Sequence, residues 1–303
     1  MRLRFLCNAQ AADLDFVSGL LGKETTVRSL KPCSRGCDCF AFELNRRRIV
    51  RFPKNINAYN KLCKEQNVLA FIGSRCPLRI PQTTVNKNGQ YVYGEHRKIV
   101  GNTLTSAQFF KLPLSSQQKF CADLAAFMAS MHTLTPEISQ TLKLPPEDCF
   151  EKLAPPEKLS AFYGRSCVLP PEKQADVRNF LKNYRPALAQ SPKVFGHFDL
   201  RPDNLAFSRS SLSLNGVFGF GNCGIGNIYD DFSRLALDYD IVVVAGVAEE
   251  YHRRTGWKPD VRLIIEAAVY NRLVFYCRRP DAENLKLLVG KIQSLNGGAH
   301  LSG

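Results

Sequence analysis

The sequence predicts an α+β fold, in which a strand-rich first third precedes a mainly helical remainder. Short β-like runs dominate the chain up to about residue 100, and helical periodicity dominates after it. The composition is that of a globular protein, because 45% of the 303 residues are hydrophobic and 22% are charged. A chain of this length can bury a sizeable core, so we expect two lobes, residues 1–100 and residues 101–303.

Three β-like runs open the chain, each rich in β-branched and aromatic residues. They read TTVRSLKP, CFAFELN and RRIVRFP, and Pro53 closes the third. A loop over residues 32–38 joins the first two runs, and the basic triplet at 46–48 is expected at a solvated hairpin turn. A second hairpin is predicted over residues 83–101, with its turn at Asn88 and Gly89.

An apolar stripe at helical spacing predicts a helix over residues 57–72. Glu65 falls within this stripe, where a carboxylate normally needs a cationic partner. The alternative is a charge at the margin of the stripe that reaches water. The residues of the stripe are Tyr59, Leu62, Leu69 and Ile72.

Helices are predicted for most of the chain after residue 100. The first has Phe120 and Met131 on its apolar face, a cap at Ser115 or Ser116, and His132 as a cap at its C-terminal end. Further helices are predicted at about residues 175–184, from Asp230, over residues 261–277 and over residues 282–295.

The net charge of +14 is concentrated in the first third of the chain. Residues 1–100 hold 18 Lys and Arg against 7 Asp and Glu, a net of +11, whereas the remainder holds 23 against 20. A basic excess is one mark of a nucleic-acid or anionic-surface binder. No zinc finger, arginine tail or helix-turn-helix pattern accompanies it, so nucleic-acid binding stays a minor hypothesis.

The eleven cysteines are scattered along the chain without a secretion signal, which is typical of reduced thiols in the cytosol. Cys33, Cys37 and Cys39 lack the paired spacing of zinc ligands and are interpreted as small apolar side chains around a loop. No run of about eighteen apolar residues is present. We therefore expect a cytoplasmic protein with no membrane-spanning helix.

The strongest functional pattern is H-F-D-L-R-P-D-N at residues 197–204, between two β-like runs. An aspartate at a strand end, here Asp199, can orient a substrate hydroxyl and accept its proton. An asparagine five residues later, Asn204, can bind a metal that is held by a triphosphate. A polar turn rich in Asp, Pro and Asn is an equally good explanation of this stretch when it is taken alone.

In its context, the pattern resembles the catalytic loop of the aminoglycoside phosphotransferase family, which is related to the protein kinases. The resemblance runs from about residue 15 to about residue 280, with the elements in the same order. It includes CSRGCDCFAFELNRRRIVRFPK, CKEQNVLAFI, RKIVGNTLT, DLAAFMASMHTL and YDDFSRLA. It implies a bilobal protein-kinase-like fold, with a β-rich nucleotide-binding lobe and a mainly helical lobe for catalysis and substrate.

The resemblance also implies roles for residues of the first lobe. Ser34, Arg35 and Gly36 would cradle the triphosphate of ATP or GTP with backbone N–H groups. Arg51 would contact the phosphates and pair with Glu65. The residues that would offer backbone groups to the purine at the hinge are Arg97, Lys98, Ile99 and Val100.

In the second lobe, Asp199 would be the catalytic base and Asn204 a metal ligand. His197 would brace the loop, and Asp231 would cap the next helix and tie it to that loop. Four carboxylates could attract a cationic acceptor, although a solvated amphipathic face explains them better. They are Asp238, Asp240, Glu249 and Glu250.

The chain departs from the family at residues 218–222, where F-G-F-G-N replaces the expected I-D-F-G-D. Gly219 stands where the family carries its principal magnesium ligand, and Asn222 and Asn227 replace two further acids. Mg²⁺, which the family implies, is therefore doubtful here. Two functions remain: a kinase that phosphorylates a small-molecule hydroxyl, with the acceptor unknown, and a pseudokinase that serves as a nucleotide-binding or protein-interaction module.

Overall fold

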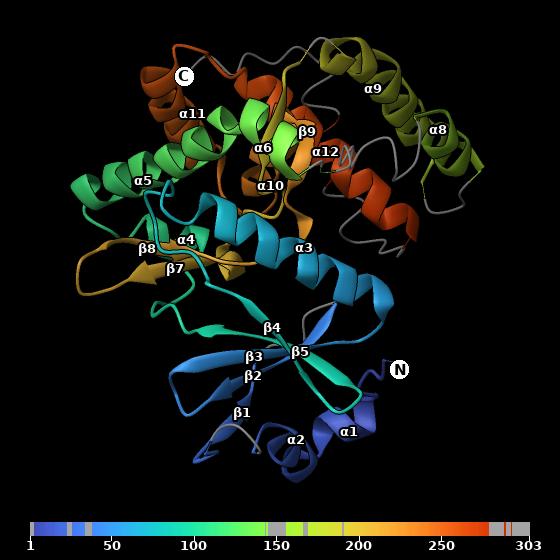
Figure 1. Ribbon diagram of the computed structural model, residues 1–303. Coiled ribbons are helices and arrows are strands. Elements are labelled where there is room, and N and C mark those ends of the chain that lie inside the picture. Colours follow the sequence, from blue (N-terminus) through green and yellow to red (C-terminus); the bar gives the residue numbers. More distant parts are fainter. Residues whose placement is uncertain are drawn as a thin grey trace. The chain divides into compact units, whose positions relative to one another are not determined.

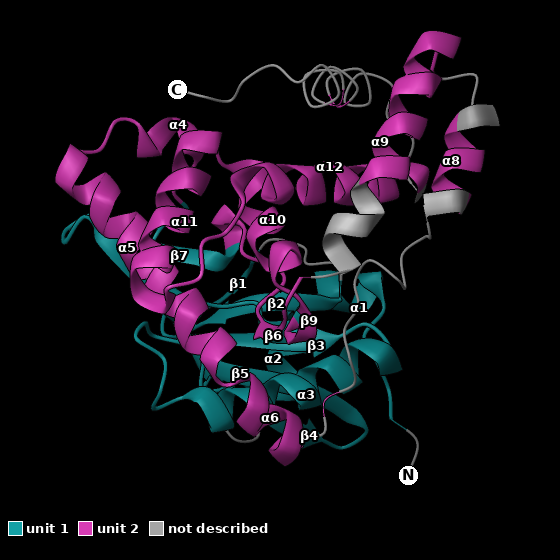
Figure 2. Cartoon of the chain, turned by 90° about the horizontal axis from the view of Figure 1, so that it is seen from above, with its two compact units in different colours: residues 1–103, 204–222 teal, residues 104–203, 223–303 magenta. Residues whose placement is uncertain are grey.

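The structure is a computed structural model that describes residues 3–22, 26–33, 38–142, 144, 156–165, 169–189, 191–278, 288 and 292. The chain forms two compact units, coloured separately in Figure 2. The first comprises Met1–Thr103 and Asn204–Asn222, and the second comprises Leu104–Asp203 and Cys223–Gly303. Strands dominate the first unit and helices the second, which confirms the predicted fold class.

The first unit is built on a five-stranded antiparallel sheet, ordered β1-β2-β3-β5-β4 (Figure 1). Its strands are β1 (Leu30–Pro32), β2 (Cys39–Leu44), β3 (Arg48–Pro53), β4 (Thr84–Asn88) and β5 (Tyr91–Arg97). Its helices are α1 (Asn8–Ala12), α2 (Leu14–Leu21) and α3 (Ile56–Ile72). The last of these is the helix predicted over residues 57–72. The turn that joins β4 to β5 is formed by Gly89 and Gln90, one residue later than predicted, because Asn88 still pairs with Tyr91 in the sheet. Gly89 has the positive φ of 58° that such a turn requires.

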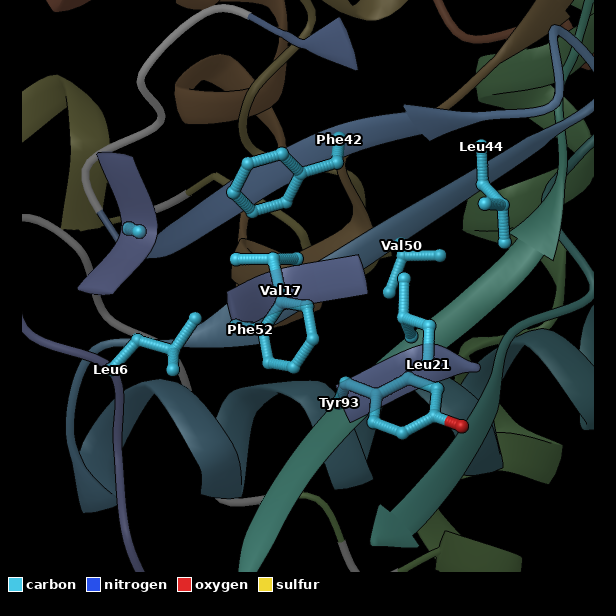
Figure 3. Close-up of a cluster of buried hydrophobic side chains, with 9 residues drawn as sticks. Leu6, Val17, Leu21, Phe42, Leu44, Val50, Phe52 and Tyr93 are labelled. Atoms are coloured by element: carbon cyan, nitrogen blue, oxygen red, sulfur yellow. The ribbon is translucent and has the colours of Figure 1, made fainter. Parts of the chain in front are cut away.

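The core of the first unit forms on one face of this sheet, against helix α2. Side chains from alternate positions of β2 and β3 meet Val17 and Leu21 there, as Figure 3 shows. The strand residues are Phe42, Leu44, Val50 and Phe52. Because successive side chains on a strand point to opposite faces, Arg51 is directed away from this core.

The segment 204–222 adds a hairpin to the first unit, formed by β7 (Leu205–Ser208) and β8 (Ser213–Val217). Asn102 and Phe207 exchange two backbone hydrogen bonds of 2.9 Å, and the Val217 N–H donates to the Arg79 carbonyl at 2.9 Å. The short 3₁₀ helix η2 (Phe220–Asn222) follows the hairpin and packs against α3. These contacts hold residues 218–222 beside the helix that carries Glu65.

The second unit is mainly helical, with one small antiparallel sheet of β6 (Lys193–Gly196) and β9 (Gly224–Asn227). The 3₁₀ helix η1 (Pro202–Asn204) follows the Asp199 loop. The helices are α4 (Ser106–Phe109), α5 (Leu114–Thr133), α6 (Thr135–Leu142), α8 (Pro156–Arg165), α9 (Pro171–Ala189), α10 (Ile228–Asp238), α11 (Ile241–Thr255) and α12 (Val261–Arg278).

Two expectations about these helices were wrong. Helix α5 begins at Leu114 after Pro113, whose fixed φ suits a helix start, so Ser116 lies buried inside the helix and caps nothing. Helix α11 was not predicted, because its first residues, I-V-V-V, are typical of a strand. Asp240 starts this helix by accepting a hydrogen bond from the Val242 N–H at 3.0 Å.

The helix predicted over residues 282–295 lies outside the described residues, apart from residues 288 and 292. Within the part of the chain that the structure describes, no helix is both long enough and apolar enough to cross a membrane.

Candidate functional site

Arg51 and Glu65 form a buried ion pair between strand β3 and helix α3. The Glu65 carboxylate accepts from both terminal nitrogens of Arg51, at 3.0 Å and 2.5 Å, and from the Thr83 hydroxyl at 3.3 Å. The Glu65 side chain is 2% exposed and that of Arg51 is 17% exposed. The carboxylate in the apolar stripe of α3 therefore has its cationic partner, and the fork of two bonds fixes the guanidinium.

The buried environment of this pair favours the uncharged forms of two neighbouring titratable side chains, His96 and Cys39. Burial, assisted by the positive charge of Arg51, lowers the pKa of His96 to about 4, so this imidazole is neutral at pH 7. Burial likewise raises the pKa of the Cys39 thiol to about 11. Arg51 and Glu65 are thus a charged pair beside two uncharged titratable side chains, those of His96 and Cys39.

The proposed purine-binding residues follow β5 in the first unit. The Arg97 carbonyl accepts a hydrogen bond from His96 Nδ1 at 2.9 Å, and the Lys98 N–H donates to the Arg47 carbonyl at 2.8 Å. The Val100 carbonyl accepts from Asn215 Nδ2 at 2.5 Å. These backbone groups therefore serve the fold, and a contact of Ile99 or its neighbours with a purine stays a prediction.

Ser34, Arg35 and Gly36, predicted to cradle the triphosphate, lie outside the described residues.

The backbone of the loop that carries Asp199 is hydrogen-bonded to the buried carboxylate of Asp231 in helix α10. Asp231 accepts hydrogen bonds from the His197 N–H at 3.2 Å and the Phe198 N–H at 2.6 Å. Phe198 adopts a left-handed backbone with φ of 57°, a strained conformation for a bulky residue. The two bonds to one carboxylate are what hold this bend in place.

Asp231 ties the helix to the loop as expected, but it does not cap the helix. Asn227 is the N-cap of α10, and its side chain accepts from the Tyr229 N–H at 2.9 Å. His197, expected to brace the loop, accepts a hydrogen bond from the Asp199 N–H at its Nδ1, at 3.2 Å.

His132 was expected to cap the end of helix α5, and this was wrong. Its buried ring bridges two helices, with Nε2 3.1 Å from Asp231 Oδ2 and Nδ1 2.8 Å from the Tyr251 hydroxyl. The two ring nitrogens are thus both engaged, and Nε2 can donate its proton to the Asp231 carboxylate. Burial opposes ionisation of the Asp231 carboxylate, but the hydrogen bonds from His132 and the Phe198 N–H, together with electrostatic attraction to the His132 and His197 rings, outweigh burial and lower the pKa of Asp231.

The Asp199 carboxylate is only 22% exposed and lies 3.0 Å from Nε of Arg201. The sequence analysis did not single out Arg201, although its position two residues after the candidate base could have indicated this contact. Asp199 and Asp203 also act electrostatically on Asp238, whose pKa is raised by its burial and by these like charges. Asp238 is therefore a neighbour of the Asp199 loop rather than part of a remote, solvated face.

Gly219 is the position where the resemblance places a magnesium ligand, and its backbone is in the left-handed region with φ of 86°. A Cβ built on Gly219 would lie 2.6 Å from Oδ1 of Asn204 and 2.8 Å from its Nδ2. The Phe218 N–H also donates to the Asn204 carbonyl at 3.0 Å. The Asn204 side chain thus occupies the space that the first carbon of a side chain at 219 would need.

Asn222 is held by a lysine. Lys61 Nζ of helix α3 lies 3.3 Å from Asn222 Oδ1 and 2.9 Å from Asp38 Oδ2. Among the described residues, no group of three or more His, Cys, Asp or Glu side chains could hold a metal. With no side chain at Gly219 and an ammonium against Asn222, these residues do not fit a magnesium site.

Comparison with known proteins agrees with this arrangement of elements. A profile of the phosphotransferase enzyme family matches residues 30–264. Among curated proteins, none matches the chain in sequence.

Three solved structures illustrate the likeness of fold. Wild-type aminoglycoside 2'-phosphotransferase-IIIa in complex with GDP has a TM-score of 0.79 at 18% identity, covering 93% of this chain and 99% of that chain. The ternary complex of APH(2")-IIa with streptomycin and ATP has a TM-score of 0.67 at 19% identity, with coverage of 95% and 97%. Macrolide 2'-phosphotransferase from Brachybacterium faecium has a TM-score of 0.66 at 12% identity, with coverage of 95% and 99%. These likenesses confirm the predicted fold.

Proposed function

Because the chain belongs to the phosphotransferase enzyme family, we propose that it binds ATP or GTP and transfers the γ-phosphoryl group to a hydroxyl of a small molecule. The observation that carries this proposal is the bidentate, buried pair of Arg51 and Glu65. Desolvating two charges is costly, so such a pair is weak evidence for stability alone. A role in orienting the Arg51 guanidinium towards phosphate oxygens would explain why the buried pair is present.

Asp199 is the proposed catalytic base. It would accept the proton of the acceptor's hydroxyl while that oxygen forms a bond to the γ-phosphorus. The bond between the γ-phosphorus and the oxygen that bridges it to the β-phosphate breaks, and the nucleoside diphosphate departs. Asp231 supports this role, because it fixes the backbone on which Asp199 stands. Arg201, whose Nε lies 3.0 Å from the Asp199 carboxylate, orients it.

The acceptor is proposed to be a hydroxyl compound of small size. Two solved structures of similar fold are complexes with gentamicin and with streptomycin, and another is a macrolide phosphotransferase. These compounds belong to the related proteins and supply the classes of acceptor to be tested here. Asp238 lies near the proposed base and offers an anionic group to an acceptor that carries an amine.

A second candidate function is that of a pseudokinase, which would bind nucleotide without productive transfer. The observation that favours it is the contact of Gly219 with Asn204, where the family has a metal ligand. Without a bridging metal, phosphoryl transfer should be slower by several orders of magnitude. We therefore expect slow turnover if the chain is an enzyme.

The two candidates separate in one experiment. Purified protein is incubated with γ-labelled ATP or GTP and a panel of aminoglycosides, macrolides and simpler amino alcohols, and labelled products are resolved by chromatography. The kinase proposal expects a labelled small molecule whose formation is lost in Asp199→Asn. Nucleotide binding by calorimetry without any transfer, in the presence of Mg²⁺ or Mn²⁺, would establish the pseudokinase instead.

A further inference from the structure

Lys61 lies between two segments of the first unit, to which the family resemblance gives roles in binding phosphate and metal. Asp38, 2.9 Å from its Nζ, is the first described residue after the predicted phosphate loop at residues 34–36. Asn222, 3.3 Å from the same Nζ, ends the segment in which the family carries its metal ligands. One ammonium group therefore contacts Asp38, which follows the predicted phosphate loop, and Asn222, which ends the second segment.

Lys61 also lies on the functional face of helix α3. Residues four apart in a helix are neighbours on one face, so Lys61 stands one turn before Glu65. Glu65 holds the guanidinium of Arg51, and the helix packs against η2, which contains Asn222. One face of α3 thus carries the Lys61 ammonium and, one turn later, the Glu65 carboxylate that holds the Arg51 guanidinium of strand β3.

The ion pair of Lys61 can exchange its partner at little cost. Its two side chains are 41% and 51% exposed, and such surface pairs contribute little to stability. An ammonium group has three N–H donors, of which the two contacts engage two. A phosphate oxygen can take the third donor or displace the Asp38 carboxylate.

We propose that the Lys61 ammonium contacts the nucleotide's phosphates in place of the divalent metal that the residues around Gly219 do not fit. This inference rests on the proposed binding of nucleotide and names the cation that makes such binding independent of metal. The neutral amide of Asn222 suits this role, because an aspartate there would add a second carboxylate to the one that Asp38 already offers the ammonium.

The test measures binding of ATP and GTP by calorimetry in buffer with EDTA and in buffer with Mg²⁺. The wild-type protein should bind in EDTA, with an affinity that Mg²⁺ changes little. Lys61→Met should weaken binding in EDTA about tenfold or more, since hydrogen bonds to charged groups are worth this much. Lys61→Arg, which keeps the charge, should retain most of the affinity.

Lys119→Met in helix α5 is the matched control. Lys119 also pairs with an aspartate at 2.9 Å and is 55% exposed, but it lies in the second unit. Both Met variants should unfold at similar temperatures, and Lys119→Met should bind nucleotide as the wild type does.

The outcomes distinguish this inference from the function on which it rests. Wild-type binding in EDTA that Lys61→Met leaves unchanged would overturn the role of Lys61 while nucleotide binding stands. Binding by the wild type only with Mg²⁺ would also overturn it. A wild-type protein that binds neither nucleotide in either buffer would refute the proposed function itself, and the inference with it.

Discussion

The side chain of Asn204 fills the space beside the α-carbon of Gly219, so that a Cβ on Gly219 would lie 2.6 Å from Asn204 Oδ1. Gly219 combines this contact with a left-handed backbone, φ of 86°. The left-handed backbone favours glycine at a position where the family has an aspartate. The contact adds to this restraint only as far as the Asn204 side chain resists turning aside.

Gly219→Ala should destabilise the protein by about 2–4 kcal/mol, because it adds left-handed strain and overpacking against Asn204. Gly89→Ala is the matched control for the strain, since Gly89 has φ of 58° with no atom near its missing Cβ. It should cost about 1 kcal/mol. Gly221→Ala, with open space and no positive φ, should cost nothing measurable. Urea unfolding of the three variants gives the comparison, and equal losses at 219 and 89 would contradict the contact.

Arg51→Met should destabilise the protein by about 3–5 kcal/mol, because it leaves the Glu65 carboxylate buried without its partner. The double variant with Glu65→Leu should recover much of this loss, since it removes both charges together. Chemical unfolding of the four species forms a double-mutant cycle.

Arg48→Met is the control on the same strand. Arg48 also forms an ion pair, 2.6 Å from Glu95, but its side chain is 49% exposed, so the loss should stay below about 1 kcal/mol. A loss at Arg48 as large as that at Arg51 would show that burial does not distinguish the two pairs.

His96 should make the protein less stable as the pH falls from 6.5 towards 4. Its folded-state pKa of about 4 lies below the ordinary 6.5, so the unfolded chain binds the proton first in this window. The stabilisation from the neutral ring is complete above pH 6.5 and amounts to about 3 kcal/mol. In His96→Gln the slope of unfolding free energy against pH should flatten between these values, and an unchanged slope would contradict the buried, neutral ring.

Asp231→Asn should cost about 3 kcal/mol or more at pH 7, because two backbone N–H groups and His132 would lose a charged acceptor. The folded-state pKa of Asp231 is depressed, so its contribution is complete above the ordinary value and is lost as the pH falls through the lower folded value. The variant's unfolding free energy should therefore depend less on pH below about 4. An acid limb as steep as that of the wild type would contradict this role of Asp231.

Patterns along the chain were enough to predict the helix that became α3 and the hairpins β2–β3 and β4–β5. Each of these elements carries its own signal, which is an apolar stripe, a basic triplet at a turn or a turn with Gly89, so the prediction needed no distant contact. Helix α11 was missed because its first residues, I-V-V-V, also satisfy a strand pattern, although Val244, Ala248 and Tyr251 recur at helical spacing.

Sequence alone determined the fold class, the family resemblance and the absence of an acidic side chain at positions 219, 222 and 227. Only the tertiary structure decided which groups stand in that place. The amide of Asn204 lies against Gly219, and Lys61 holds Asn222 from 161 positions earlier in the chain. The sequence gives the type of each residue, but tertiary packing determines which distant residues it contacts. Because these contacts join segments far apart in the chain, the spacing of residues within one segment does not predict them.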